Sequence, residues 1–127
     1  MAIRIAINGL GRIGRCVLRA LVEEGYTGIE IAAVNGPAPT ETHVHLLKYD
    51  SVHGRFPGPV EAHGDALSLG GKTFPVFHER DVNKLDWGKV GADIVLECTG
   101  KFTRAAEAVR HLERGAKKVL ISAPAKD

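Results

Sequence analysis

The stretch from Asn8 to Gly14 reads NGLGRIG and places three glycines, Gly9, Gly11 and Gly14, in the spacing G-x-G-x-x-G. In dinucleotide-binding folds the first glycine permits a tight turn, and the second lets a pyrophosphate approach the backbone. The third glycine lets a helix pack closely on a strand. The same glycines would also suit a tight strand-to-helix turn that binds no ligand. The interpretation therefore depends on the segments that flank them.

The flanking segments favour the dinucleotide-binding interpretation. The β-branched run IRIAI predicts a strand over residues 3–7. Apolar residues then recur at helical spacing over residues 12–24, and Gly25 is a plausible end for that helix. An almost wholly apolar run over residues 29–35 predicts a second strand, covered on both faces. The glycine turn thus lies inside a strand–helix–strand unit, which is the context that the motif requires.

The rest of the chain continues the alternation of strands and helices, with one interruption rich in glycine and proline. The pattern predicts a helix capped by Thr40 over residues 40–49, antiparallel strands and hairpins over 54–78, a strand over 93–98, a helix over 103–114 and a strand over 118–122. We therefore predict an α/β fold, Rossmann-type and doubly wound, whose mostly parallel sheet carries a small antiparallel insertion. Residues 1–127 are expected to form one dinucleotide-binding domain.

The composition is that of an ordinary globular domain. A net charge of +2 gives no basic stripe for nucleic acid, and no apolar run approaches the roughly 20 residues that span a bilayer. We therefore expect neither a nucleic acid nor a membrane as partner. Two cysteines, Cys16 and Cys98, make no disulfide framework, so a cytoplasmic setting is expected. His43 and His45 diverge on a helix, and no metal site is predicted.

Three polar residues around the glycine turn have open interpretations. Asn8 precedes the glycines and could hold the turn through side-chain hydrogen bonds. Arg12 either faces bound phosphates or is a solvated arginine at a helix start, whereas Arg15 is expected to be solvated. Whatever these side chains do, the first turn of the helix offers free N–H groups and a positive dipole end to an anion.

Four longer segments resemble one known family. They are AINGLGRIGR, HLLKYDSVHGRF, DIVLECTGKFT and GAKKVLISAPAKD, and together they extend from residue 2 to residue 127. On these segments the chain resembles phosphorylating glyceraldehyde-3-phosphate dehydrogenase, in its N-terminal NAD(P)-binding domain. A sister family, erythrose-4-phosphate dehydrogenase, shares most of the segments and remains an alternative, although SAPAKD looks more like the glyceraldehyde enzyme.

The resemblance implies a set of cofactor contacts. Arg12 and Ile13 would meet the pyrophosphate, Arg80 in HERD would lie on the adenine side, and Ser122 would lie near the nicotinamide. Residues of CTGKF would follow a strand at its carboxyl end, where open α/β sheets bind ligands. The complete predicted cofactor-binding set is Asn8, Gly9, Gly11, Arg12, Ile13, Gly14, Asn35, Gly36, Arg80, Thr99, Gly100, Phe102 and Ser122.

The resemblance also implies an activity for the parent protein. The family oxidatively phosphorylates an aldose phosphate by hydride transfer to a nicotinamide cofactor, and works as a glycolytic homotetramer. Its nucleophilic cysteine lies in an SCTTNC-like segment that these 127 residues do not contain, so we expect no catalytic residue and no catalytic domain here. Neither Cys16 nor Cys98 is expected to replace it. A non-catalytic nucleotide-binding module is the alternative.

Gly36 is the main departure from the family pattern. In NAD-preferring members an aspartate follows the asparagine that ends the second strand, and here Gly36 follows Asn35. That carboxylate accepts hydrogen bonds from the adenosine ribose and repels a 2′-phosphate. Gly36 suits the turn before Pro37, and it also leaves room for NADP; the two interpretations can hold together. Glu41 is the nearest acid that follows in the sequence. The predicted cofactor is therefore NAD or NADP, with NADP tolerated.

Overall fold

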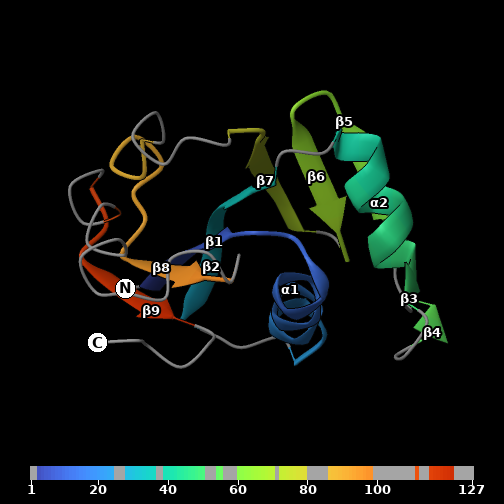
Figure 1. The fold of residues 1–127 in the computed structure, drawn as a ribbon, viewed down its shortest axis with the longest axis horizontal. Helices are drawn as coiled ribbons and strands as arrows, with labels where there is room; N and C mark the ends of the chain where they lie inside the picture. The colour runs from blue at the N-terminus through green and yellow to red at the C-terminus, as the bar shows by residue number, and fades with distance from the viewer. Residues whose placement is uncertain are drawn as a thin grey trace.

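A computed structural model of the chain describes residues 3–24, 28–36, 39–50, 54–55, 60–70, 72–79, 86–98, 111 and 115–121. Strands and helices alternate from β1 to α2, and the described elements after α2 are strands (Figure 1). In chain order the elements are β1 (Ile3–Asn8), α1 (Arg12–Glu24), β2 (Ile29–Asn35), α2 (Thr40–Lys48), β3 (Tyr49–Asp50), β4 (Gly54–Arg55), β5 (Val60–His63), β6 (Ala66–Leu69), β7 (Lys72–Phe77), β8 (Ile94–Glu97) and β9 (Lys118–Ile121).

The described strands form a mostly parallel sheet in the order β5-β6-β7-β2-β1-β8-β9. β1 lies in its interior and pairs in parallel with β2 on one side and with β8 on the other. The chain thus first adds the strands β2 to β7 on one side of β1 and later adds β8 and β9 on the other side. Such a reversal of strand order leaves a crevice at the carboxyl ends of the strands, where α/β sheets bind ligands.

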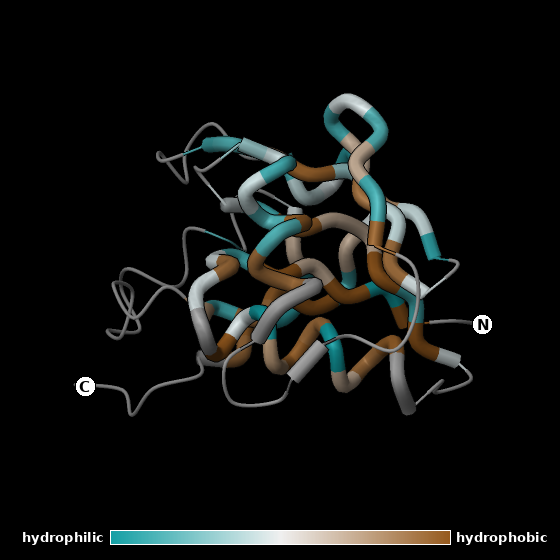
Figure 2. The backbone as a smooth tube through the Cα atoms, turned by 90° about the vertical axis from the view of Figure 1, so that its right-hand side faces the viewer, coloured by the Kyte–Doolittle hydropathy of each residue, from teal (hydrophilic) through white to brown (hydrophobic). Residues whose placement is uncertain are grey.

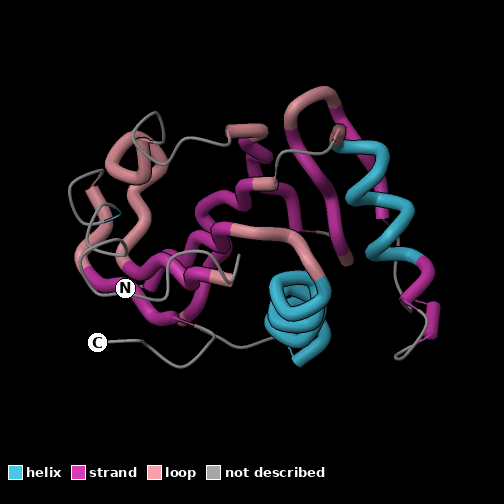
Figure 3. Tube along the Cα trace, viewed as in Figure 1, coloured by secondary structure: helices cyan, strands magenta, loops and turns pink. Residues whose placement is uncertain are grey.

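The antiparallel insertion forms one edge of this sheet. β5, β6 and β7 pair as an antiparallel meander, and the end of β7 then pairs in parallel with β2, at Val34–Val76 and Asn35–Phe77. In Figure 3 β5 and β6 lie beside α2, whereas β7 lies on the side of β2, and the two-residue strands β3 and β4 form a separate hairpin. The predicted fold class, a mostly parallel sheet with a small antiparallel insertion, is confirmed.

Two apolar clusters cover the two faces of the sheet, because successive strand residues point to opposite faces. On one face Ile7 of β1 packs with Leu18 of α1 and Leu47 of α2. On the other, Ala6 and neighbouring alanines make room for the buried indole of Trp87. In Figure 2 the hydrophobic residues, coloured brown along the backbone, gather in the centre of the molecule.

The predicted boundaries of the first βαβ unit agree with the structure to within one residue. β1 extends one residue further than predicted, and both α1 and β2 have the predicted bounds. Gly25 and nearly all of the helix predicted over residues 103–114 lie outside the described residues. His111, from that segment, is helical and fully buried.

Asp93 ties the amino ends of three strands together. One of its carboxylate oxygens accepts a hydrogen bond from the amide of Arg4 (2.9 Å), and the other lies 3.1 Å from Nζ of Lys117. The Arg4 amide, and secondarily Lys117, hold the pKa of Asp93 below its ordinary value of 3.8. Because the folded-state pKa is lowered, this carboxylate stabilises the fold above that value and ceases to do so as the pH falls through the folded pKa.

We therefore expect Asp93→Asn to lower the melting temperature at pH 7, and this difference to shrink as the pH falls below about 4. Thermal unfolding of both proteins across pH 2–7 measures the effect. Lys117→Gln keeps the Arg4 hydrogen bond and should reproduce only part of the dependence. A melting-temperature difference that stays constant with pH would show that the Asp93 charge does not stabilise the fold.

Candidate functional site

The three motif glycines occupy structurally different positions between β1 and α1. Gly9 has a φ of +103°, a conformation that side chains disfavour, so the turn itself requires glycine. A Cβ at Gly14 would collide with the carbonyl oxygen of Gly9, so Gly14 is needed for α1 to approach β1. A Cβ at Gly11 would meet nothing within 4 Å. The backbone over Gly11 is therefore open, as a ligand approaching the start of α1 would require.

Two side chains of the first turn of α1 differ in their surroundings. Ile13 is 51% exposed, unusual for a large apolar residue, and lies beside the open glycine. The expectation that Arg15 is solvated is wrong: Arg15 is half-buried, and its Nη1 donates a hydrogen bond to the carbonyl of Leu10 (3.0 Å). The guanidinium of Arg15 thereby holds the backbone of the glycine loop at Leu10. The side chain of Arg12 lies outside the described part of the structure.

The ends of β1 and β2 are joined through their final asparagines. Asn35 Nδ2 donates hydrogen bonds to Asn8 Oδ1 (2.7 Å) and to the carbonyl of Glu79 (2.9 Å), and Asn35 Oδ1 accepts from the Glu79 amide (2.9 Å). Asn8 was expected to hold the glycine turn through its side chain, but its amide bonds across the strands instead. Both asparagines are buried, so they position the strand ends and the segment after β7.

A buried polar network extends from Asn8 of β1 to Glu97 of the neighbouring strand β8 and on to His111 and Trp87. Glu97 Oε1 accepts hydrogen bonds from Asn8 Nδ2 (2.7 Å) and His111 Nε2 (2.8 Å). Trp87 Nε1 donates to His111 Nδ1 (2.9 Å). Because an indole N–H can only donate, Nδ1 must accept, which puts the imidazole proton on Nε2, facing Glu97. Glu97, His111 and Trp87 are at most 1% exposed.

Sequence reasoning did not find this network. Its members come from a strand end, a turn and residue 111, and the Asn8–His111 pair is separated by 103 positions. One signal was available, namely the glutamate inside the apolar run DIVLEC, because a charged residue in a buried strand needs partners. Its partners could not be named from the sequence, since they depend on which segments pack against β8.

Gly36, directly after β2, is more tightly enclosed by neighbouring residues than expected. It is buried, and its amide donates to the carbonyl of Phe77 (2.9 Å). A Cβ at this position would lie 2.7 Å from Cε1 and 2.8 Å from Nε2 of His43, and 3.4 Å from Cβ of Leu10. The imidazole of His43 therefore occupies the space that a side chain at position 36 would need. That Gly36 leaves room for the 2′-phosphate of NADP stays a prediction. Glu41 is exposed on the first turn of α2.

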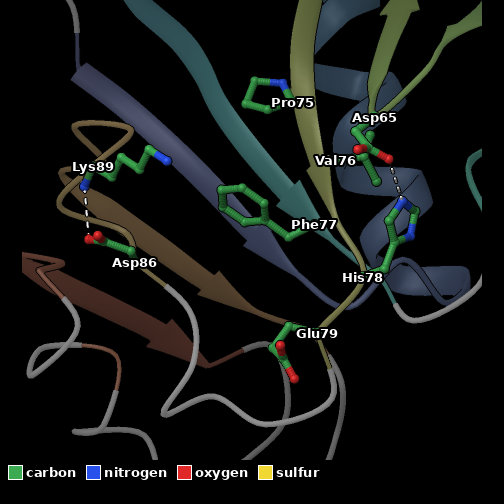
Figure 4. Close-up of a pocket in the computed structure, with 8 residues that line it drawn as sticks. All are labelled: Asp65, Pro75, Val76, Phe77, His78, Glu79, Asp86 and Lys89. Atoms are coloured by element: carbon green, nitrogen blue, oxygen red, sulfur yellow. Dashed lines mark hydrogen bonds and ion pairs between the residues drawn. The ribbon is translucent and has the colours of Figure 1, made fainter.

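A cavity of about 470 Å³ opens beside the end of β7 (Figure 4). Phe77 points to one side of the strand, where its ring lies 6.0 Å from that of Trp87. His78 points to the other side, toward Asp65, and Glu79 follows at the strand end. The lining residues are Asp65, Pro75, Val76, Phe77, His78, Glu79, Asp86 and Lys89. The cavity thus adjoins the segment that Asn35 holds in place.

The structure brings part of the predicted site together. Asn8, Asn35 and Gly36 lie at the carboxyl ends of β1 and β2, Gly9 and Gly11 lie in the turn between β1 and α1, and Arg12, Ile13 and Gly14 lie in the first turn of α1. The other predicted residues lie outside the described ranges, namely Arg80, Thr99, Gly100, Phe102 and Ser122. Cys98, directly after β8, is buried, and Cys16 of α1 is half-buried.

Metal-binding side chains are dispersed over the described part of the fold. Within these ranges no three His, Cys, Asp or Glu side chains gather as a metal site would require. No helix in the described part of the chain is long and apolar enough to cross a membrane.

A central parallel sheet, a glycine turn into α1 and an open backbone at Gly11 define a Rossmann-type dinucleotide-binding domain. The model of one family, described as "Glyceraldehyde 3-phosphate dehydrogenase, NAD binding domain", matches residues 3–105, and the chain belongs to that family.

Similar proteins carry the same name. Glyceraldehyde-3-phosphate dehydrogenase of Xanthobacter flavus is 51% identical over 98% of this chain and 37% of its own length. The proteins of that name from Geobacillus stearothermophilus and Streptomyces coelicolor are 52% and 53% identical over the whole chain, which matches 37% and 38% of their lengths. The chain thus spans little more than a third of the curated relatives it matches.

Proposed function

We propose that these 127 residues form one domain that holds a nicotinamide dinucleotide, NAD or NADP, at the carboxyl ends of β1 and β2. Gly9, Gly11 and Gly14, with Arg12 and Ile13, would surround the pyrophosphate at the start of α1. The observation that carries the proposal is the open space over Gly11, next to free backbone N–H groups and an exposed isoleucine.

The remaining predicted contacts extend this site along the edge of the sheet. Asn35 and Gly36 would border the adenosine ribose, and Arg80, which follows Glu79 in the sequence, would contact the adenine side. Thr99, Gly100 and Phe102 follow β8 in the sequence, and Ser122 follows β9. These four would border the nicotinamide half, since the strands that precede them are parallel to β1.

For the parent protein we propose the oxidative phosphorylation of glyceraldehyde 3-phosphate by hydride transfer to this cofactor, in a cytoplasmic homotetramer. The names of the similar proteins support this activity over the erythrose-4-phosphate alternative and over a non-catalytic module. The bound cofactor accepts the hydride, and this chain's own residues would bind and orient it. The nucleophile would belong to the remainder of the parent protein.

Calorimetric titration of the 127-residue chain with NAD and with NADP tests the proposal. We expect saturable binding of at least one dinucleotide, with one site per chain. No heat of binding from either dinucleotide, with circular dichroism showing a folded chain, would overturn the proposed function.

We also expect the isolated chain to have no dehydrogenase activity. Cys98 is buried and Cys16 is half-buried within a helix, so neither offers an accessible thiolate for the aldehyde. The assay supplies glyceraldehyde 3-phosphate, phosphate and either dinucleotide, and follows absorbance of the reduced cofactor. Preparations of the Cys16→Ser and Cys98→Ser variants control for contaminating host enzyme. Turnover that disappears in one of these variants would contradict the prediction.

A further inference from the structure

Two histidines from different elements converge on Gly36, the residue directly after β2. His43 lies on α2, and its Nε2 is 3.4 Å from the carbonyl oxygen of Gly36. His78 follows β7, and its Nδ1 is 3.2 Å from the same oxygen. The two rings are stacked, with centroids 6.4 Å apart and planes inclined by 8°. Neither histidine was predicted to belong to the site, because the pair meets only through the pairing of β7 with β2.

The hydrogen bonds determine how each ring is oriented. A carbonyl oxygen can only accept, so both imidazole nitrogens that face Gly36 donate. His78 Nε2 lies 3.2 Å from the hydroxyl of Thr40, which can donate to it, and 3.8 Å from Oδ1 of Asp65. The side chain of His78 is 30% exposed, whereas His43 is 3% exposed. A ligand can therefore reach the side chain of His78, whereas His43 is enclosed by the protein and lies against Gly36.

A side chain at position 36 and the imidazole of His43 would compete for the same space. Because the His43 ring lies 2.7 Å from where a Cβ of residue 36 would be, a side chain at 36 requires the imidazole to move. His43 is itself buried, so its imidazole has little solvent-facing space into which it could move. The position at which related folds carry an acid is thus occupied by imidazole in this chain.

We propose that His78 determines the cofactor specificity of this domain by contacting the 2′-phosphate of NADP, and that His43 fills the space in which a carboxylate at position 36 would lie. The inference rests on the proposed function, since it places the adenosine ribose at the end of β2. A carboxylate there would repel the 2′-phosphate, whereas a ring N–H of an imidazole can donate a hydrogen bond to it. His78 would turn its Nδ1–H from the carbonyl of Gly36 to the phosphate.

Dinucleotide titrations of four proteins by calorimetry test the contact. The native chain is expected to bind NADP at least as tightly as NAD. His78→Ala should weaken NADP binding about tenfold, the loss of one charge-assisted hydrogen bond, and leave NAD binding within a factor of about two. Asp65→Asn removes the carboxylate beside His78 and should strengthen NADP binding only. His45→Ala is the matched control, because His45 is exposed on the same helix as His43.

A second set of variants tests the coupling of positions 36 and 43. Gly36→Asp alone places the new side chain against the imidazole and is expected to destabilise the chain. Gly36→Asp combined with His43→Leu makes space for the carboxylate and should restore stability, keep NAD binding and weaken NADP binding by about a hundredfold. His43→Leu alone should retain NADP binding, because position 36 stays uncharged.

The outcomes separate the two proposals. If neither dinucleotide binds the folded native chain, the proposed function fails. If both bind, but the ratio of NADP to NAD affinity is the same in the native chain, His78→Ala and the double variant, the histidines do not read the 2′ position. Adenosine 2′,5′-bisphosphate and adenosine 5′-monophosphate are titrated in the same way, and the ratio of their affinities must change across the variants as the ratio of NADP to NAD affinity does. A preference that vanishes with these two fragments would also overturn the inference.

Discussion

Glu97→Ala is expected to lower the free energy of unfolding by about 3–5 kcal/mol, the largest stability change that the described residues predict. The carboxylate accepts hydrogen bonds from Asn8 and His111, and all three side chains are buried. Alanine would leave both donors without an acceptor in a place that water does not reach, and would add a cavity. Urea denaturation followed by circular dichroism measures the change.

Glu97→Gln is the matched control for this prediction. Its remaining Oε1 can still accept from Asn8 and His111, so we expect a loss of only about 1–2 kcal/mol. Trp87 donates to His111 and reports on the network through its fluorescence. The network would be unimportant for stability if Glu97→Ala cost less than about 1 kcal/mol, or if it cost no more than Glu97→Gln.

The same network explains how β1, β2 and β8 end at a common level. Asn8 links Glu97 on one neighbouring strand to Asn35 on the other, and Asn35 in turn holds the backbone of Glu79. A displacement of any member would shift the strand ends at which the dinucleotide is proposed to bind. Rigid supporting partners of this kind hold binding residues at fixed distances, which a loop alone cannot do.

The features that were predictable from the sequence are local ones. The bounds of α1 and β2 follow from apolar spacing and from the glycines that precede α1, and each depends on neighbouring residues only. The structural roles of Gly9 and Gly14 were likewise predicted, since a tight turn and a close helix approach are properties of one short segment. The parallel arrangement followed from the alternation of strands and helices.

The features that the sequence did not predict depend on contacts between distant segments. His43 was treated as one of two diverging histidines on a helix, and the divergence is correct, because His43 is buried and His45 is exposed. Its contact with Gly36 could not be inferred, since the position of α2 relative to β2 follows from packing across the sheet. The imidazole of His43 fills the space that a side chain at position 36 would need, because an absent side chain creates space only where no neighbour fills it.

Gly11→Val is expected to weaken dinucleotide binding by about a hundredfold or more, with the melting temperature almost unchanged. A Cβ at this position meets nothing within 4 Å, so the substitution has little to disturb in the free protein. The pyrophosphate, however, would have to occupy the space that the valine fills. Calorimetric titration gives the affinity, and thermal unfolding without ligand gives the stability. Arg80→Ala, on the adenine side, should cost less affinity than Gly11→Val.

Gly14→Ala, in the same motif, is expected to change the stability of the free protein, in contrast to Gly11→Val. Its Cβ would collide with the carbonyl of Gly9, so this variant should lose stability even without ligand, and any loss of affinity would follow from the shifted helix. Ala20→Val, at an exposed position of α1, controls for adding a β-branched residue to the helix. If Gly11→Val binds as tightly as the native chain, or if Arg80→Ala costs more affinity than Gly11→Val, the pyrophosphate does not lie over Gly11. The dinucleotide would then have to be anchored elsewhere along the carboxyl edge of the sheet.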